Sequence, residues 1–193
     1  MIDGTLAGLL RAARFTVQNP RAGARALLDM RLPTSVRWLS FGLVITGSSV
    51  LTVLAVRLSP AGSDPAVQPV LSQPIALAMM QGVVMLIFAQ LMFRVGQMAG
   101  GRGGFADALL LLTWMQMILM LLQVAQLVLE VALPPAADLL GLFGLVLMLW
   151  LVTHFVAELH GFTSLGAVFA GVVGTVMGAG FAASLLLVAL VGV

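Results

Sequence analysis

Five long apolar runs constrain this chain more than any other feature of its sequence. A helix crosses the hydrocarbon core of a bilayer with about 20 apolar residues. Only 8% of the residues are charged, whereas a soluble domain has roughly a quarter. The sequence therefore predicts an all-α polytopic membrane protein in which a transmembrane domain, 38–193, follows an N-terminal segment, 1–37. The five spans are expected at about 38–58, 75–95, 106–129, 139–157 and 165–192.

The stretches between these runs have the composition of helix ends and turns. The segment 59–74 contains four Pro, which cannot continue a helix, and 99–104 is the Gly-rich connector AGGRGG. Pro134 and Pro135 end the third span. The segment HGFTS, 160–164, supplies a Gly to stop the fourth span and a hydroxyl to cap the fifth.

The positions of the nine Arg residues predict the orientation in the membrane. Six of them precede the first span, and Arg94 and Arg102 lie around the second connector, so only Arg57 falls on the other side. The positive-inside rule then places the N-terminus in the cytoplasm and the C-terminus in the periplasm. The abundance of Ala, Gly and Leu and the absence of Lys are typical of a GC-rich bacterial genome. We therefore expect the bacterial inner membrane, with no nucleic-acid partner.

The N-terminal segment has its own periodicity. Apolar residues recur at helical spacing in its first part, and Asn19-Pro20 is typical of a helix start, which predicts a second helix over 20–30. With Arg interleaved, the segment is expected to lie as two amphipathic helices on the anionic cytoplasmic leaflet. The alternative is a basic tail that only enforces topology. The apolar positions are Leu6, Leu9, Leu10, Ala13 and Val17.

Two of the spans carry patterned side chains. In the third, Gln116, Gln123 and Gln126 share one helical face, which has to point toward other helices or water rather than lipid. The face serves either a polar pathway or interhelical hydrogen bonds, and we favour hydrogen bonds because Gln does not ionise. The fifth span repeats small residues every four positions, which lets a neighbouring helix approach closely. These are Gly166, Ala170, Gly174, Gly178 and Ala182.

Three ionisable residues close the fourth span. His154 and Glu158 are four residues apart and share a face, and His160 follows them. Two His and one carboxylate are possible Zn²⁺ or Fe²⁺ ligands, but no HExxH pattern accompanies them. Interhelical contacts and a helix end at the water interface account for the same residues. We favour these interpretations and predict no metal, no cofactor and no catalytic residue.

Three short motifs resemble the Yip family of five-span membrane proteins. They are NPRAGARALLDM at 19–30, GGRGGFADALLLL at 100–112 and LHGFTSLGAVFAGV at 159–172. The resemblance covers about residues 15–192 and implies the fold and membrane residence of a bacterial member. The acidic-aromatic-Gly-Pro motif of the eukaryotic N-terminal domain is missing here, so the Rab GTPase partner of those members is not implied.

The sequence favours a non-enzymatic interaction or scaffold protein, which includes an accessory subunit of a larger complex. Its partners would be the lipid bilayer and other membrane proteins or further copies of itself. The groups expected to face a partner on the cytoplasmic side are Arg94, Arg102, Glu158 and His160. The alternative is a small-solute or ion transporter that uses the polar faces of spans two to four. A membrane enzyme ranks third because the few acids and His residues are dispersed.

Overall fold

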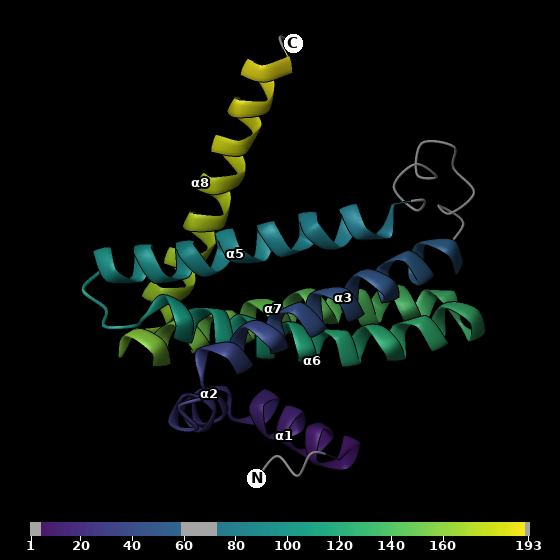
Figure 1. Ribbon diagram of the computed structural model, residues 1–193, viewed down its shortest axis with the longest axis horizontal. Helices are drawn as coiled ribbons and strands as arrows, with labels where there is room; N and C mark the ends of the chain where they lie inside the picture. The colour runs from purple at the N-terminus through teal and green to yellow at the C-terminus, as the bar shows by residue number, and fades with distance from the viewer. Residues whose placement is uncertain (1–4, 59–72, 192–193) are drawn as a thin grey trace.

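The computed structural model describes residues 5–58 and 73–191, and in these ranges it is entirely helical. The Pro-rich segment predicted between the first two spans falls almost wholly outside the described residues, as does Gly192 at the end of the fifth span. Figure 1 shows the arrangement. The helices are α1 (Leu6–Gln18), α2 (Pro20–Asp29), α3 (Thr34–Leu58), α5 (Pro74–Met98), α6 (Phe105–Ala132), α7 (Pro134–His160) and α8 (Leu165–Val191).

The predicted fold class is confirmed. Five helices, α3, α5, α6, α7 and α8, are long and apolar enough to cross a membrane. The helices α3, α5, α6 and α7 extend beyond the apolar runs that predicted them, because polar residues at the ends of a span can stay helical outside the hydrocarbon. In α7, for example, Pro134 and Pro135 open the helix, where their missing N–H groups cost nothing, and His160 is still helical.

Four of the long helices pack side by side, and α6 lies at their centre. It contacts α3, α5 and α7, and its residues Leu109 to Leu112 are buried. Opposite them, Leu151 and Phe155 of α7 are fully buried. Lipid is as apolar as these side chains, so close packing rather than escape from water stabilises such a bundle.

The short helices α1 and α2 fold back beneath this bundle (Figure 1). Pro20 occupies the first turn of α2, as predicted, although the Asn19 side chain makes no capping bond. Trp114 of α6 donates its indole N–H to Thr16 Oγ1 of α1 over 3.1 Å, and Thr16 in turn donates to the carbonyl of Ala12. Gly23 of α2 lies against Thr16, where a Cβ would approach within 2.7 to 2.9 Å. The buried hydroxyl of Thr16 thus helps to attach α1 and α2, which we call the N-terminal hairpin, to the bundle.

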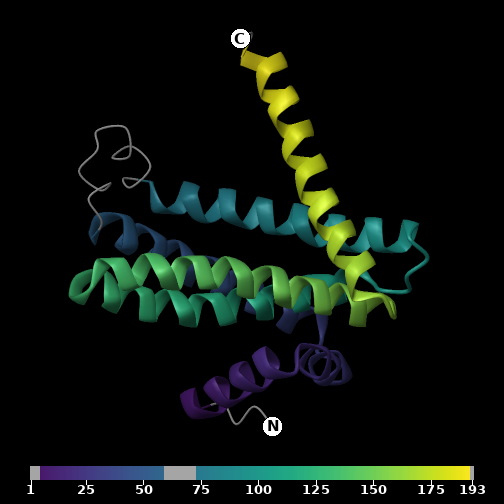
Figure 2. The same cartoon turned by 180° about the vertical axis from the view of Figure 1, so that it is seen from behind.

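The helix α8 leaves the bundle instead of joining it. Figures 1 and 2 show it crossing α5 and projecting away toward the C-terminus. None of the 18-residue apolar window in its described part is buried. A Cβ added at Gly166, Gly174 or Gly178 would meet nothing within 4 Å, so these three glycines of the predicted small-residue face have no close neighbour among the described residues.

We expect Gly23→Ala to destabilise the protein, because the new methyl group has to displace Thr16 and its bond to Trp114. Overpacking of this kind costs about 1–3 kcal/mol. Thermal unfolding in mild detergent measures the change. Gly42→Ala in α3 is the matched control, since a Cβ there meets nothing within 4 Å. Equal midpoints for the two variants would contradict the close contact between α1 and α2.

Candidate functional site

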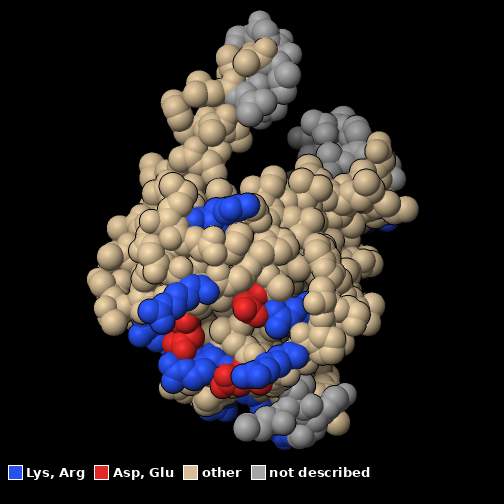
Figure 3. Space-filling model, turned by 60° about the vertical axis from the view of Figure 1, so that its left-hand side comes forward, with Lys and Arg blue, Asp and Glu red and all other residues tan. Residues whose placement is uncertain are grey.

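Charged side chains gather at one end of the bundle, where α5 and α7 end and α6 begins. Figure 3 looks onto this end and shows Arg and acidic side chains interleaved around it. We call it the charged end and define it by α2, the connector 99–104 and the turn 161–164. Its ionisable groups include Arg21, Arg25, Arg37, Arg94, Arg102, Asp107, Glu158 and His160.

The ring of His160 fills a pocket between α7 and the connector. Only 4% of the residue is exposed. The backbone N–H of Gly103 donates to Nδ1 over 3.2 Å, and Nε2 lies 3.0 Å from the carbonyl oxygen of Met92. A carbonyl only accepts, so Nε2 carries the proton and Nδ1 is the acceptor. The neutral imidazole thus uses both nitrogens to join α7 to α5 and to the connector.

Three glycines make room for this ring. A Cβ at Gly96, Gly101 or Gly103 would overlap the side chain of His160 or that of Leu159 beside it. The sequence predicted a Gly-rich connector over 99–104, and in the structure its residues Gly101 and Gly103 are packed against His160 and Leu159. The glycine-rich motif and the histidine, far apart in the chain, therefore form one packing unit.

The turn after α7 is held by several contacts. Gly161 adopts a left-handed conformation with φ of 75°, which favours glycine, and the N–H of Phe162 donates back to the carbonyl of Ala157. The ring of Phe162 stacks on His160 with centroids 5.5 Å apart. Arg21 Nη2 donates to the carbonyl of Phe162. Ser164 caps α8, as predicted, through a bond from the N–H of Ala167.

Two salt bridges attach the N-terminal segment to the charged end. Arg25 Nε of α2 lies 2.7 Å from Glu158 Oε1 of α7, and Arg37 Nη1 of α3 lies 2.5 Å from Asp107 Oδ1 of α6. The hydrogen bond that Arg25 donates to Glu158, together with the negative charge of that carboxylate, raises the pKa of Arg25. The guanidinium is therefore charged at neutral pH.

The structure separates the three residues considered for a metal. His154 turns back onto its own helix, where Nδ1 donates to the carbonyl of Trp150 over 2.7 Å and the ring lies against the Trp150 ring. Glu158 faces Arg25, and His160 faces the connector. Among the residues that the structure describes, no three His, Cys, Asp or Glu side chains gather around a possible metal position.

Arg94 and Arg102, which the sequence predicted to face a partner together with Glu158 and His160, lie on the surface. Arg94 is exposed and its guanidinium carbon sits 5.3 Å from the centre of the Phe93 ring. Arg102 is exposed at the tip of the connector. Neither forms a salt bridge with any residue in the described ranges. Glu158 and His160, in contrast, are turned inward and support this surface from beneath.

The predicted Gln face points toward neighbouring helices. Gln123 Nε2 lies 3.4 Å from Thr52 Oγ1 of α3, a long hydrogen bond between helices. Gln126 packs next to Gly141 of α7, where a Cβ would come within 3.1 Å of its amide. Gln116 lines a cavity between α5, α6 and α7. The contact between Gln123 and Thr52 is of the interhelical kind that the sequence favoured.

Sequence reasoning missed the contacts that join separate segments. Thr16 and Trp114 have no recognisable motif, and their bond spans 98 positions. The one available signal was the density of glycine around Gly96, Gly101 and Gly103, since glycine repeated at a helix end indicates the close approach of another group.

We expect His160→Ala to be strongly destabilising, because it empties the glycine-lined pocket and leaves the N–H of Gly103 unbonded. Leaving such a buried group without its partner costs about 1–3 kcal/mol. The measurement is the thermal midpoint in detergent. His154→Ala should lose less, since the Trp150 carbonyl belongs to the helix interior and keeps a backbone partner. A larger loss for His154→Ala would show that His160 is not the central contact.

Reversing the bridge between α2 and α7 provides a second test. Arg25→Glu places two carboxylates together and should release the N-terminal helices, which limited proteolysis detects as faster cleavage within residues 5–33. Adding Glu158→Arg restores opposite charges and should restore protection. If the double variant is cleaved as fast as Arg25→Glu alone, the bridge does not hold α2 in place.

Comparison with protein families matches the Yip1 domain over residues 15–187. No curated protein and no solved structure gave a match. The matched range contains the last turn of α1, all of α2, the four packed spans and most of α8. It also contains all three motifs on which the sequence resemblance depends. This match over nearly the whole chain, together with five helices able to cross a membrane, shows that the chain belongs to the Yip1 family.

Proposed function

We propose that the chain is a non-enzymatic interaction protein of the membrane, which binds other membrane proteins through its charged end. The observation that carries the proposal is the division of the Arg residues there. Arg21, Arg25 and Arg37 make contacts within the chain, whereas Arg94 and Arg102 face outward. Internal contacts make the end rigid, and the outward pair gives it a positive surface.

The proposed partner surface follows the end of α5 and the connector. Between its two Arg residues lies Met98, which is 87% exposed. A flexible apolar side chain flanked by positive charges suits a partner segment that combines acidic and apolar residues. Glu158 and His160 belong to the same site as supports, because they fix α2 and the connector under it.

The same arrangement supports the proposed topology. The charged end contains most of the described Arg residues, and Arg57 lies at the other end of α3. We infer that the charged end is cytoplasmic and, from the composition, that the membrane is a bacterial inner membrane. On α1, Leu6 and Leu10 are exposed beside Arg14, which suits contact with the anionic leaflet.

The test is affinity purification from native membranes in mild detergent, followed by mass spectrometry of the proteins that co-elute. We expect a stoichiometric partner membrane protein, and we expect Arg94→Glu with Arg102→Glu to reduce its recovery at least tenfold. Arg57→Glu is the matched control, since it reverses a charge at the other end of the bundle and should leave recovery unchanged.

Two results would contradict the proposal. Recovery of the free chain alone, without any stoichiometric partner, would remove the interaction role. Full recovery of a partner with the double variant would keep that role but place the surface elsewhere, against the assignment of Arg94 and Arg102.

A further inference from the structure

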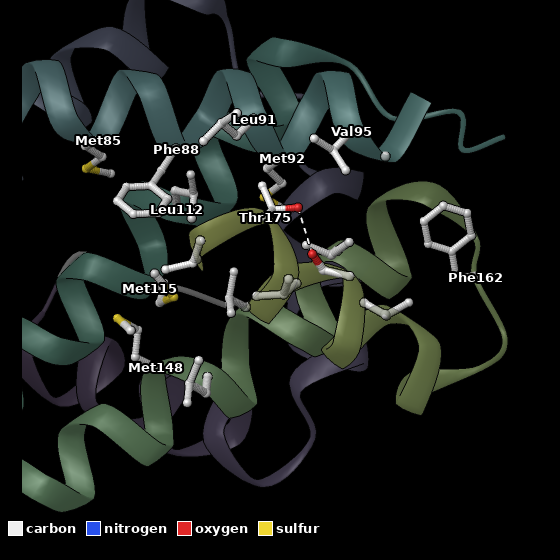
Figure 4. Close-up of a pocket in the computed structure, with 18 of the residues that line it drawn as sticks. Met85, Phe88, Leu91, Met92, Val95, Leu112, Met115, Met148, Phe162 and Thr175 are labelled. Carbon is white, nitrogen blue, oxygen red and sulfur yellow. Dashed lines mark hydrogen bonds between the residues drawn. The ribbon is translucent and has the colours of Figure 1, made fainter. Parts of the chain in front are cut away.

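A long apolar groove runs between α5 and α7, with α6 as its floor and the first turns of α8 along one side. Its volume is about 760 Å³, within the range of ligand-binding sites. Figure 4 shows Phe88 and Met92 of α5 above Met115 and Met148. Along α5 it extends from Gln81 to Ala99, which are 18 residues apart, and at 1.5 Å per residue this is about 27 Å. It is therefore nearly as long as the hydrocarbon core is thick.

The helix that could close this groove is directed away from it. α8 lines the groove only through the residues between Ala167 and Val176 and then departs. Its direction is set by the turn, in which Arg21 holds the Phe162 carbonyl, His160 stacks on the Phe162 ring and Ser164 caps α8. In this structure α8 leaves the groove after Val176, so the outer part of the groove is not covered by α8.

The mouth of the groove at the charged end is polar and lies next to an Arg side chain. Phe162, Thr163 and Ser164 line it there, and Arg21, which does not itself line the groove, donates to the carbonyl of Phe162. No acidic residue is among the described residues that line the groove. A guanidinium behind two hydroxyl-bearing residues is complementary to a phosphate group.

We propose that the groove binds one anionic phospholipid, with its acyl chains along the α5–α7 walls and its phosphate beside Arg21, Thr163 and Ser164. The apolar walls fit the chains, and the charge at the mouth selects the headgroup. This site is separate from the partner surface at Arg94 and Arg102, so either can exist without the other. The bound lipid would fill the space that α8 leaves open.

The test uses the full chain in nanodiscs of phosphatidylcholine containing about one tenth phosphatidylglycerol, followed by release into mild detergent and native mass spectrometry. We expect one phosphatidylglycerol retained per chain. Gly171→Phe fills the groove, where the added side chain has open space, and should lower retention at least fivefold. Gly174→Phe is the matched control on the same helix, because Gly174 does not line the groove, and it should retain the lipid.

The headgroup contact is tested in the same experiment. Arg21→Gln should remove the preference for phosphatidylglycerol over phosphatidylcholine, and Arg94→Gln, at an exposed position outside the groove, should keep it. Thermal midpoints of all four variants establish that each is folded. Equal lipid retention by the two Phe variants would overturn the groove assignment. An unchanged preference in Arg21→Gln would overturn the assignment of the phosphate position.

Disulfide crosslinking between introduced cysteines detects whether α8 or a second copy of the chain occupies the groove instead of lipid. The chain has no cysteine of its own, so only the introduced pair can react. Val84 lies in the groove wall, and Ala179 is on α8 beyond the turns that line the groove. In Val84→Cys with Ala179→Cys, a disulfide requires the two Cα atoms to come within about 7 Å. We expect almost none in the nanodisc. An efficient bond within one chain would show that α8 closes its own groove, and one between chains would show that a second copy fills it; either result overturns the proposal.

Discussion

The imidazole of His160 joins three parts of the chain at the charged end. One nitrogen bonds the connector and the other bonds α5, while the ring supports Phe162 in the turn to α8. Both bonds require a neutral ring of one tautomer, and the pocket requires glycine at Gly96 and Gly101. α8 starts just beyond this contact, and α2 reaches α7 next to it through the salt bridge between Arg25 and Glu158.

Arginine has two roles at this end, and they differ in whether the guanidinium has a bonding partner within the described chain. Where a guanidinium meets a carboxylate or a carbonyl of the same chain, as in Arg25 and Arg21, it attaches the N-terminal hairpin to the bundle. Where it meets water, as in Arg94 and Arg102, it is available to a partner. The internal contacts of Arg21 and Arg25 hold this end of the bundle rigid. Binding of a partner through Arg94 and Arg102 therefore loses less conformational entropy. The proposed interaction surface therefore depends on residues that do not belong to it.

Membrane proteins cannot depend on water to drive their spans together, so shape and hydrogen bonds decide which helices pack. Four spans here meet through buried aliphatic side chains and the contact between Gln123 and Thr52. In the described part of the fifth, no glycine makes a close contact with the bundle, and the hydroxyls of Thr175 and Ser184 bond to carbonyls of α8 itself. That difference leaves both a free helix and an open groove, and the proposed lipid site is a consequence of the open groove.

The sequence by itself determined the helical class, the five spans and the family, because each depends on local composition: apolar length, prolines at the breaks and short motifs. It also predicted the Gly161 stop and the start of α2 at Pro20, which are set by backbone conformation within a few residues. Only the tertiary structure decided which partner each polar group takes. Glu158 and His160 are neighbours in sequence, yet one faces Arg25 and the other the connector. Thr16 and Trp114 meet across 98 positions, and α8 leaves the bundle. Such contacts depend on how helices pack in three dimensions, and the spacing of residues along one chain does not encode them locally.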